Sequence, residues 1–374
     1  MKLIALCLLA ACSTGAYCAE ANLGFRLPAG FTAEILVDDV PNARSLALGD
    51  DGTLFVATRR LGKVYAVRDA LTGEPQVLTI ADGLKVPNGI AFHDGALYVA
   101  ELSRLLRFPD IEARLVAAGE SAVIDPEVID PELPVSGKLH QWKYLAFGPD
   151  GKLYISLGAP CNICDAPDMA TILRMNADGS EREVFARGVR NSVGFDWHPA
   201  TGEMWFTDNG RDLLGDEIPP CELNRVSEPG QHFGYPFCHG SDIVDPKFGE
   251  LGRCDDSITP IQALGPHVAP LGMRFYTGST FPSEYANQVF IAEHGSWNRS
   301  KSAGKTGYRL TLVRLSGNVA VSYEPFMEGF LGADDQVIGR PVDILIAPDG
   351  ALLVSDDQRG VVYRISYDAD RHDG

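Results

Sequence analysis

The sequence predicts an all-β protein, a six-bladed β-propeller, because one short motif occurs six times along 374 residues. The motif is an apolar strand, a tight turn and a second apolar strand that ends in polar residues. Its copies begin at Ala43, Pro87, Trp142, Ser192, Gly272 and Pro341. Hairpins that recur every ~40 to 60 residues are typical of propeller blades. Four turns contain Asp-Gly pairs, which supply the positive-φ positions of tight hairpins, at residues 51–52, 94–95, 150–151 and 349–350.

The remaining chain is predicted to be strands and loops with little helix. No stretch of about a dozen residues keeps apolar positions at helical spacing without an interrupting Pro or Gly. No low-complexity linker separates the blades, so we interpret residues 22–374 as one domain. Gly24 to Asp39 is expected to add an outer strand to the last blade and so close the ring. Three inserts are expected to form loops over one face: Phe108 to Leu139, Pro219 to Pro270 and Asn298 to Tyr308.

Residues 1–21 are predicted to be an export signal, with a short charged start, an apolar run over residues 3–11 and small residues after it. Two endings are open. One is a lipoprotein signal with a lipid anchor on Cys12, and the other is ordinary cleavage after Ala21. The protein is expected to be exported, either periplasmic or secreted, and to attach to a membrane only if Cys12 is lipidated. No later run of 18 apolar residues follows.

In an oxidising compartment the cysteines are expected to form disulfides. The motif Cys161-Asn-Ile-Cys164 lacks the following His of a haem attachment site, and no second CxxC completes a zinc site. A local bridge between Cys161 and Cys164 is therefore favoured. A second bridge, from Cys238 to Cys254, would staple the insert in the fourth blade. Cys221 has no evident partner.

Propeller topology brings two sets of side chains to one mouth of the central channel. Within each blade the inner strand runs toward the turn and the second strand runs back, so residues before the first and after the second meet. Loops on a rigid scaffold are where sites are normally built. The first set is Arg44, Asn88, His140, Arg190, Asn191 and Arg340. The second set is Arg59, Glu101, Asn209, Gly210, Arg211, Glu293, His294, Asp356 and Asp357.

The charge of the mouth differs from that of the whole chain. The chain has 50 acidic and 32 basic residues, a net charge of −18, which argues against nucleic acid or anionic membranes as partners. The mouth is nevertheless rich in arginine, which suggests an anionic ligand because guanidinium groups bind carboxylates through paired hydrogen bonds. His140 is a candidate general base near neutral pH. A purely structural role is the competing interpretation for channel side chains, Arg44 and Arg59 included.

Several strings resemble the soluble quinoprotein sugar dehydrogenases, in particular their L-sorbosone dehydrogenase-like branch. They occur in order over most of the chain after the signal and fall at the mouth positions. The strings are HQWKYLAFGPDGKLY, GAPCNIC, RGVRNSVGFDWHP, TDNGRD followed by GDEIPP and ELNRV, FGYPFCHG, LGPHVAPLGMRFYTG, AEHGSWNRS and GRPVDILIAPDG.

The resemblance implies a propeller that holds pyrroloquinoline quinone (PQQ), whose carboxylates would explain the arginines, and Ca²⁺. It implies that His140 takes a proton from the hydroxyl of an aldose or related sugar aldehyde while hydride passes to the quinone. Arg190 and Asn191 would bind the quinone oxygens, with Arg190 stabilising the developing charge. The carbonyls of Gly210 and Arg211 would bind Ca²⁺. Electrons would then pass to a periplasmic acceptor such as cytochrome c.

The sequence also departs from the family pattern. Val342 stands where soluble glucose dehydrogenases have a second cofactor-binding arginine, and the lysine expected in the fifth-blade loop is missing. Other residues near the mouth are expected to make those contacts beside Arg340. They are His294, Trp297, Arg299 and Lys305.

Two alternative functions stay open. A propeller hydrolase or lactonase would need carboxylates that converge on a central Ca²⁺, and Glu101, Glu293 and Asp356 are its candidates. A non-catalytic sugar-binding propeller would explain the fold and the export signal, but not the grouping of His140 with Arg190 and Asn191.

Overall fold

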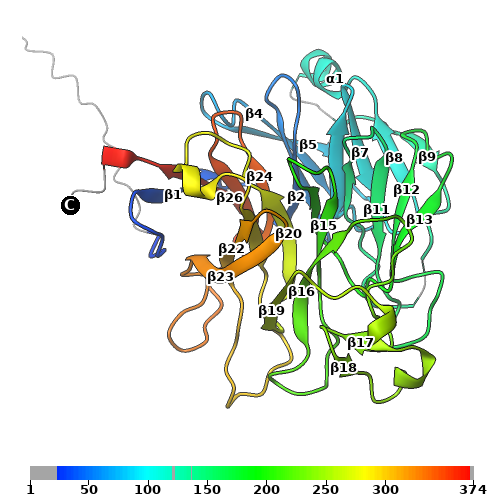
Figure 1. The fold of residues 1–374 in the computed structure, drawn as a ribbon. Helices are drawn as coiled ribbons and strands as arrows, with labels where there is room; N and C mark the ends of the chain where they lie inside the picture. Colours follow the sequence, from blue (N-terminus) through cyan, green and yellow to red (C-terminus); the bar gives the residue numbers. More distant parts are fainter. Residues whose placement is uncertain (1–22, 120–122, 136, 371–374) are drawn as a thin grey trace, which may run out of the picture.

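The structure, a computed structural model, describes residues 23–119, 123–135 and 137–370, so the predicted export signal and Cys12 lie outside it. Six four-stranded antiparallel sheets stand around a common axis (Figure 1). The all-β class and the six-bladed β-propeller are therefore confirmed. None of the helices in the described ranges is long and apolar enough to cross a membrane.

The first three blades follow one another along the chain, each with its strands in sequence order from the centre outward. Blade one contains β2 (Ala43–Leu48), β3 (Leu54–Thr58), β4 (Val64–Arg68) and β5 (Gln76–Ala81). Blade two contains β6 (Gly89–His93), β7 (Ala96–Ala100), β8 (Leu105–Phe108) and β9 (Glu127–Asp130). Blade three contains β10 (Leu145–Phe147), β11 (Leu153–Leu157), β12 (Thr171–Met175) and β13 (Glu183–Arg187).

The other three blades include one long insert and the closure of the ring. Blade four contains β14 (Phe195–Trp197), β15 (Met204–Asp208), β16 (Pro220–Val226) and β19 (Gln262–Pro266). Blade five contains β20 (Pro270–Phe275), β21 (Val289–Glu293), β22 (Arg309–Ser316) and β23 (Val319–Met327). Blade six contains β24 (Pro341–Ile346), β25 (Leu352–Asp356), β26 (Val361–Tyr367) and, as its outer strand, β1 (Phe31–Val37).

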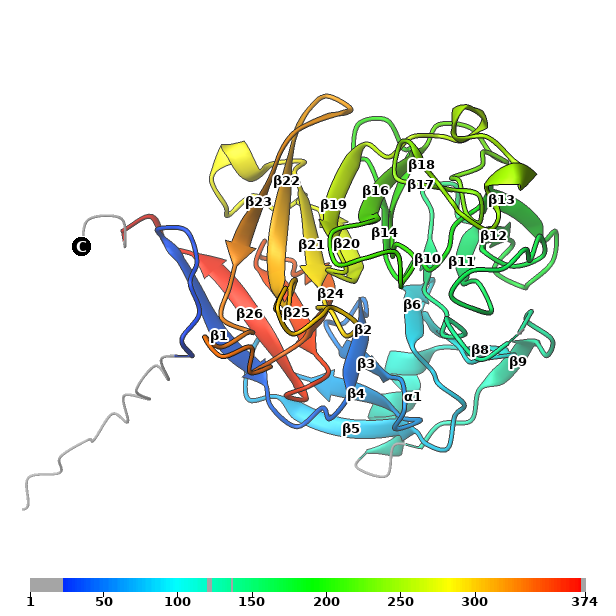
Figure 2. The ribbon, with the colours of Figure 1, turned by 90° about the horizontal axis from the view of Figure 1, so that it is seen from below.

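The strand β1 closes the ring as the sequence predicted. It pairs antiparallel with β26, with Phe31 opposite Tyr367, so the two ends of the described chain share one blade. Figure 2 shows this pair side by side, and it shows the inner strands β2, β6, β10, β14, β20 and β24 around the axis. Closure of this kind joins the first and last parts of the sequence through main-chain hydrogen bonds.

The Asp-Gly pairs form the tight turns expected of them. Between β6 and β7 only Asp94 and Gly95 lie outside the strands, and both have positive φ, 47° and 71°. Glycines at three other turns, Gly52, Gly151 and Gly350, also have positive φ. Two-residue loops with this backbone match the right-handed twist of the flanking strands.

The inserts differ in part from the expected loops over one face. The first contains the one α-helix of the described residues, α1 (Ile111–Ala118), and Glu112 of this helix accepts hydrogen bonds from the backbone of Asp51 and Thr53. The helix therefore lies at the turn end of the propeller, because its carboxylate satisfies the first hairpin turn. Later residues of this insert reach the mouth, where the backbone of Lys138 and Leu139 donates to Pro160.

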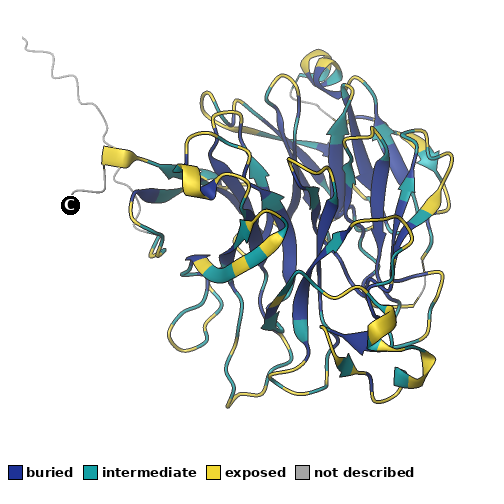
Figure 3. Cartoon of the chain, viewed as in Figure 1, coloured by how far each residue is buried: buried dark blue, intermediate teal, exposed yellow. Residues whose placement is uncertain are grey.

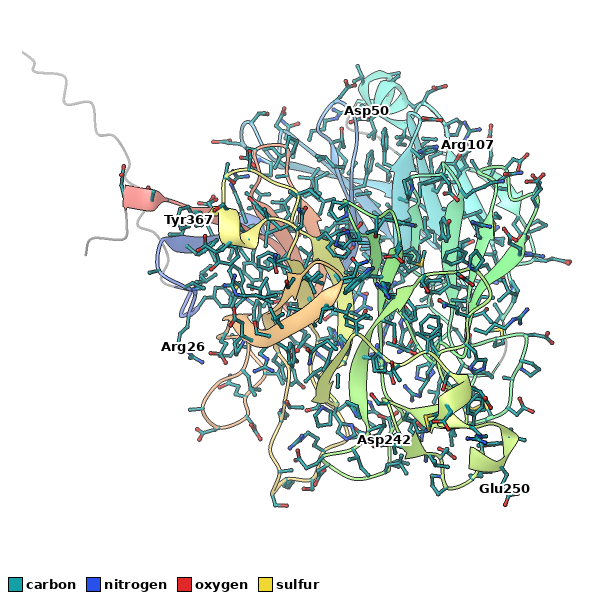
Figure 4. All side chains as sticks on the ribbon, in the orientation of Figure 1. Arg26, Asp50, Arg107, Asp242, Glu250 and Tyr367 are labelled. Atoms are coloured by element: carbon teal, nitrogen blue, oxygen red, sulfur yellow. A yellow bond between two sulfur atoms is a disulfide. The ribbon has the colours of Figure 1, made fainter. Side chains whose placement is uncertain are left out.

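The range Pro219 to Pro270 is not one loop, because it contains the outer strands β16 and β19. The insert itself lies between them and carries a small hairpin, β17 (Cys238–His239) and β18 (Ile243–Val244). Figure 4 shows Asp242 and Glu250 of this insert at one end of the molecule and Asp50, in the first hairpin turn, at the other. Among the described residues, short 3₁₀ turns also occur at Gly249–Leu251, Cys254–Asp256 and Ser283–Tyr285.

The core consists of the faces that neighbouring blades turn toward each other. Figure 3 shows the strands largely buried and the connecting loops exposed. At the centre, Asp343 of β24 accepts hydrogen bonds from the backbone of Leu46 and Ile344, and Arg274 of β20 lies 3.7 Å from it. These contacts join blades one, five and six at the axis, so the mouth residues stand on a rigid ring.

Candidate active site

Members of both predicted sets of mouth residues line one pocket of about 390 Å³. This volume is within the range usual for small-molecule sites. Six other members do not line it: Asn88, Glu101, Arg211, Glu293, Asp356 and Asp357. Five arginines and one carboxylate line it: Arg44, Arg59, Arg60, Arg190, Arg340 and Asp212. Other lining residues include His140, Trp142, Asn191, Asn209, Gly210, Cys221, His294, Trp297 and Asn298.

His140 is held in a single, buried orientation. Its backbone has φ of 52°, in the left-handed region, and a Cβ on Gly158 would lie 2.5 Å from the His140 Cβ. The ring Nδ1 lies 2.9 Å from the carbonyl oxygen of Ala159. Because a carbonyl only accepts, Nδ1 carries the proton and Nε2 is the free base of the neutral ring. Burial, with a further contribution from Arg190, lowers the pKa of His140 to about 3.

Arg190 is fixed by the loop that the first disulfide closes. Its Nε donates to the carbonyl of Asn162 at 3.0 Å, and Nη2 donates to the Asn162 side chain at 2.9 Å and to Asp212 at 3.1 Å. Asn162 lies between Cys161 and Cys164, which are bonded as predicted. Sequence reasoning did not assign Asn162 a role, although its place inside the CxxC loop was visible.

Asn191 presents an unused amide to the pocket. Its backbone N–H donates to Asp208 at 2.6 Å, whereas its side chain makes no hydrogen bond to any residue in the described ranges. The residue is only 6% exposed and lines the pocket. An amide that is buried and unpartnered in this way is available to a ligand.

Gly210 and Arg211 follow β15, and only Gly210 lines the pocket. The Arg211 side chain turns away and forms an ion pair with Asp245, which also accepts from His239 at 2.9 Å. Within the described chain, the carbonyls of Gly210 and Arg211 accept no hydrogen bond, and no three His, Cys, Asp or Glu side chains group as a metal site. Any cation bound here would therefore be coordinated mainly by backbone oxygens and by atoms of a small molecule in the pocket.

His294 and Arg44 share one carboxylate. The Nε2 of His294 lies 3.0 Å from Asp357, and Arg44 Nη1 donates to the same carboxylate at 2.9 Å. Burial lowers the pKa of His294 to about 4, although Asp357 opposes the shift. His294 is thus neutral, and Asp357 compensates Arg44. The pairing joins residues 313 positions apart, so only the closed ring reveals it.

Arg340 and Trp297 complete the pocket on the blade-five side. Arg340 donates to the backbone carbonyls of His294 at 3.1 Å and Gly295 at 3.2 Å, and it makes no ion pair with a described carboxylate. Trp297 is 75% exposed, so its ring lies at the rim. Both residues lie where the sequence predicted.

Three residues that the sequence analysis discussed as cofactor-binding positions, Arg299, Lys305 and Val342, lie outside the pocket lining. Arg299 donates to Glu217 at 2.9 Å and to nearby carbonyls, and Lys305 donates to the carbonyl of Asp335 at 2.6 Å, so neither lines the pocket. Val342 is buried among the apolar residues of the core. Arg44 and Arg59, for which a structural role is the competing interpretation, both line the pocket.

The cysteines follow the predicted pattern. Cys238 is bonded to Cys254 and so staples the insert of blade four. Cys221 is a free, buried thiol that lines the pocket. Burial raises the pKa of this thiol to about 12, so it stays protonated at neutral pH.

The carboxylates proposed for a hydrolase do not converge. Glu101 accepts from the backbone of Lys85 and from Arg104, and Glu293 accepts from Arg309 at 2.8 Å. Asp356 accepts from the Arg340 backbone and from neighbouring loop residues. Each carboxylate accepts hydrogen bonds from residues near it in its own blade and does not point to a shared cation site. This arrangement disfavours the hydrolase interpretation.

The described chain is thus a six-bladed propeller whose mouth pocket groups five arginines with His140. A sequence model of the glucose/sorbosone dehydrogenase family matches residues 111–364, and the chain belongs to this family of oxidoreductases. It is also similar to an uncharacterized protein of Borreliella burgdorferi, with 34% identity over 358 residues that cover 93% of this chain and 92% of that protein.

Solved structures share the fold at low sequence identity. The PQQ domain of pyranose dehydrogenase from Coprinopsis cinerea, in its holo form, has a TM-score of 0.72 at 18% identity, covering 93% of this chain and 98% of that one. The PQQ-bound aldose sugar dehydrogenase of Streptomyces coelicolor has a TM-score of 0.63 at 20% identity, covering 92% and 100%. These likenesses support the six-bladed architecture.

Proposed function

We propose that the protein oxidises an aldose or a related sugar aldehyde with PQQ and Ca²⁺ bound in the mouth pocket. Electrons then pass to a periplasmic acceptor such as cytochrome c. The observation that carries this proposal is the surplus of arginine over carboxylate around a neutral, oriented His140. The family to which the chain belongs gives it independent support.

The pocket residues fit a polycarboxylate cofactor. Arg59, Arg60 and Arg340 form no ion pair with a carboxylate in the described ranges, so they can meet the negative charges of a ligand. The unpartnered amide of Asn191 can bind a carbonyl or hydroxyl oxygen. When bound, the quinone supplies the acceptor for a hydride and the two electrons it carries.

His140 is the general base of the proposed reaction. Its Nε2 takes the proton of the sugar hydroxyl as the carbon that bears this hydroxyl loses hydride, so an aldose becomes a lactone. The bond from Nδ1 to Ala159 fixes the tautomer and prevents the ring from turning. The low pKa of His140 keeps its ring unprotonated at all pH values around neutrality.

Arg190 and Asn191 are the proposed partners of the reacting quinone oxygens. The guanidinium is held by Asn162 and Asp212 before any ligand arrives, so little reorganisation is needed when charge develops. Gly210 and Arg211 have backbone carbonyls free for Ca²⁺, a cation that binds oxygen ligands.

Export is part of the proposal. The two disulfides support an oxidising compartment, periplasmic or extracellular, and lipidation of Cys12 is the proposed condition for membrane attachment. The net charge of −18 favours encounter with a basic redox partner.

The test is dye-linked oxidation of a panel of aldoses and osones by the quinone-free protein. PQQ and Ca²⁺ are added separately and together. The proposal predicts activity only with both. Turnover with Ca²⁺ alone would instead indicate hydrolase chemistry, and failure of folded protein to bind PQQ would contradict the proposal.

A further inference from the structure

Arg59 is a pocket cation that forms no ion pair with a carboxylate in the described part of the chain. It follows β3 at the mouth, and its guanidinium carbon lies 4.5 Å from the centre of the Trp142 ring. The guanidinium forms no hydrogen bond or ion pair with any residue that the structure describes. By contrast, Arg44 has Asp357 and Arg190 has Asp212.

The surroundings of Arg59 increase the need for an anion. Burial, and then the neighbouring cations Arg44, Arg60 and Arg340, lower the pKa of Arg59 to about 10, although Asp357 opposes the shift. The group is still charged at neutral pH. A partly desolvated cation among like charges is unfavourable until an anionic group joins it.

The backbone holds Arg59 in place before a ligand binds. The side-chain oxygen of Asn42 accepts hydrogen bonds from the backbone N–H of Arg59 at 3.0 Å and of Arg60 at 2.8 Å. Trp142 supports the guanidinium from blade three, and its ring centre lies 6.0 Å from that of His140. Arg59, from a fixed loop, and the proposed base His140 therefore lie near the same Trp142 ring in one pocket.

We infer that Arg59, supported by Trp142, forms a carboxylate-binding subsite of the mouth pocket beside His140. The inference rests on the proposed function and adds to it a cation-bearing residue from blade one. Two ligands offer this chemistry: a carboxylate of the quinone, or the carboxylate of an acidic sugar such as a uronic acid. A planar guanidinium with free N–H groups binds either one.

The experiment compares Arg59→Met and Arg59→Lys with wild-type protein. Arg253→Met is the matched control, because it removes one positive charge from an exposed residue paired with Asp255 outside the pocket. In one arm, PQQ and its trimethyl ester are titrated into quinone-free protein, and Kd is measured by tryptophan fluorescence. In the other arm, Kd is measured calorimetrically for a uronic acid and for the neutral aldose of the same ring configuration.

Because Arg59→Met removes a charge-assisted contact, we expect it to raise the Kd of one of the two carboxylate ligands by about 10- to 100-fold. The ester and the neutral aldose should change by less than about twofold, and Arg59→Lys should recover part of the affinity. The arm that responds identifies the source of the carboxylate. Unchanged Kd for both acids in folded Arg59→Met, or equal loss for charged and uncharged ligands, would overturn the subsite.

The experiment also separates failure of the proposed function from failure of the subsite. Wild-type protein that does not bind PQQ contradicts the quinone proposal, and the uronic acid arm then decides the subsite alone. Folded wild-type protein that binds neither acid would overturn both.

Discussion

His140 shows how burial can set the state of a single side chain. The imidazole has lost most of its solvent and stands near the Arg190 cation, so its protonated form is disfavoured. The carbonyl of Ala159 then selects the tautomer with Nε2 free. The absence of a side chain at Gly158 leaves room for this arrangement. These features keep His140 a neutral ring with an unprotonated Nε2 in the quinone-free site.

The state of His140 is directly measurable. Since its folded pKa lies below the unfolded value of about 6.5, the folded ring stays neutral as pH falls from 8 to 5. We expect its NMR signals in quinone-free protein to stay unchanged over that range, with the spectrum of His140→Gln identifying them. A midpoint near pH 6.5 would contradict the buried, neutral ring.

Behind the pocket, Glu222 is a second buried group with a large shift. Burial, and then the carboxylate of Asp208, raise the pKa of Glu222 to about 8. Asp208 faces Glu222 across β15 and β16 and is itself bound by the backbone N–H groups of Arg190 and Asn191. The folded state thus holds a proton that the unfolded state releases above about pH 4.5.

Stability should therefore fall as pH rises from about 4.5 to 8, because the folded state binds more protons there. Glu222→Gln removes this penalty. We expect the variant to exceed wild type in unfolding free energy by on the order of 1 to 3 kcal/mol at pH 9, with little gain at pH 5. Denaturant titrations at both values check this. A gain that does not depend on pH would contradict the shifted carboxyl.

At the scale of elements, the two disulfides are expected to contribute differently, one to the geometry of the site and the other to stability. The bridge between Cys161 and Cys164 spans three positions and holds Asn162 against Arg190, whereas the bridge between Cys238 and Cys254 spans 16. The longer loop restricts the unfolded chain more, by about 3 kcal/mol against about 2 kcal/mol. The first bridge should then matter more for the site and the second more for stability.

Paired serine variants test this division. Replacing both Cys161 and Cys164 by Ser should raise the Kd for PQQ about tenfold, because Arg190 loses its brace. Replacing both Cys238 and Cys254 should cost about 3 kcal/mol of unfolding free energy and leave that Kd nearly unchanged. Fluorescence titration and denaturant unfolding measure the two quantities. A larger rise in the Kd for PQQ in the variant without Cys238 and Cys254, or a larger loss of unfolding free energy in the variant without Cys161 and Cys164, would contradict the assignment.

At the scale of the whole molecule, the ring depends on β1. Phe31 begins this strand and packs against the rings of Phe281, Tyr285, Phe326 and Tyr367, with centres 4.7 to 5.1 Å apart. These partners come from blades five and six. One side chain therefore fastens the closing strand to two blades.

Phe31→Ala should lower the unfolding free energy by about 3 to 5 kcal/mol, the usual cost of removing a buried aromatic ring. Ile35→Ala in the same strand is the control, because Ile35 is 36% exposed, and its loss should cost less than about 1 kcal/mol. Thermal and denaturant unfolding measure both variants. Equal effects would contradict a closing role for Phe31.

The architecture could be predicted from the sequence because its signals are local. Six hairpins of apolar strands repeat along the chain, four of them with Asp-Gly turns, and the pairing of Gly24 to Asp39 with the last blade follows from ring closure. Neighbouring positions also suggested the bridge from Cys161 to Cys164. The helix α1 was missed, since it is short and its Glu112 is fixed by a distant turn.

The site could be predicted only in part, because its contacts join distant positions. The strand ends brought His140, Arg190, Asn191 and Gly210 to one mouth as expected. No sequence pattern indicates that Arg299 turns to Glu217. The ion pair of Arg44 with Asp357 and the stacking of Arg59 on Trp142 depend equally on blades that meet only in the closed ring.

The most direct test of sugar oxidation at this mouth is anaerobic reduction of bound PQQ in a single turnover. Protein loaded with PQQ and Ca²⁺ is mixed with an aldose, and the quinone spectrum is followed in wild type and His140→Gln. We predict rapid reduction in wild type and a rate lower by about 10² to 10⁴ in the variant, with similar PQQ affinity. Equal rates in both proteins, or no reduction by any aldose or osone, would contradict the proposed role of the pocket.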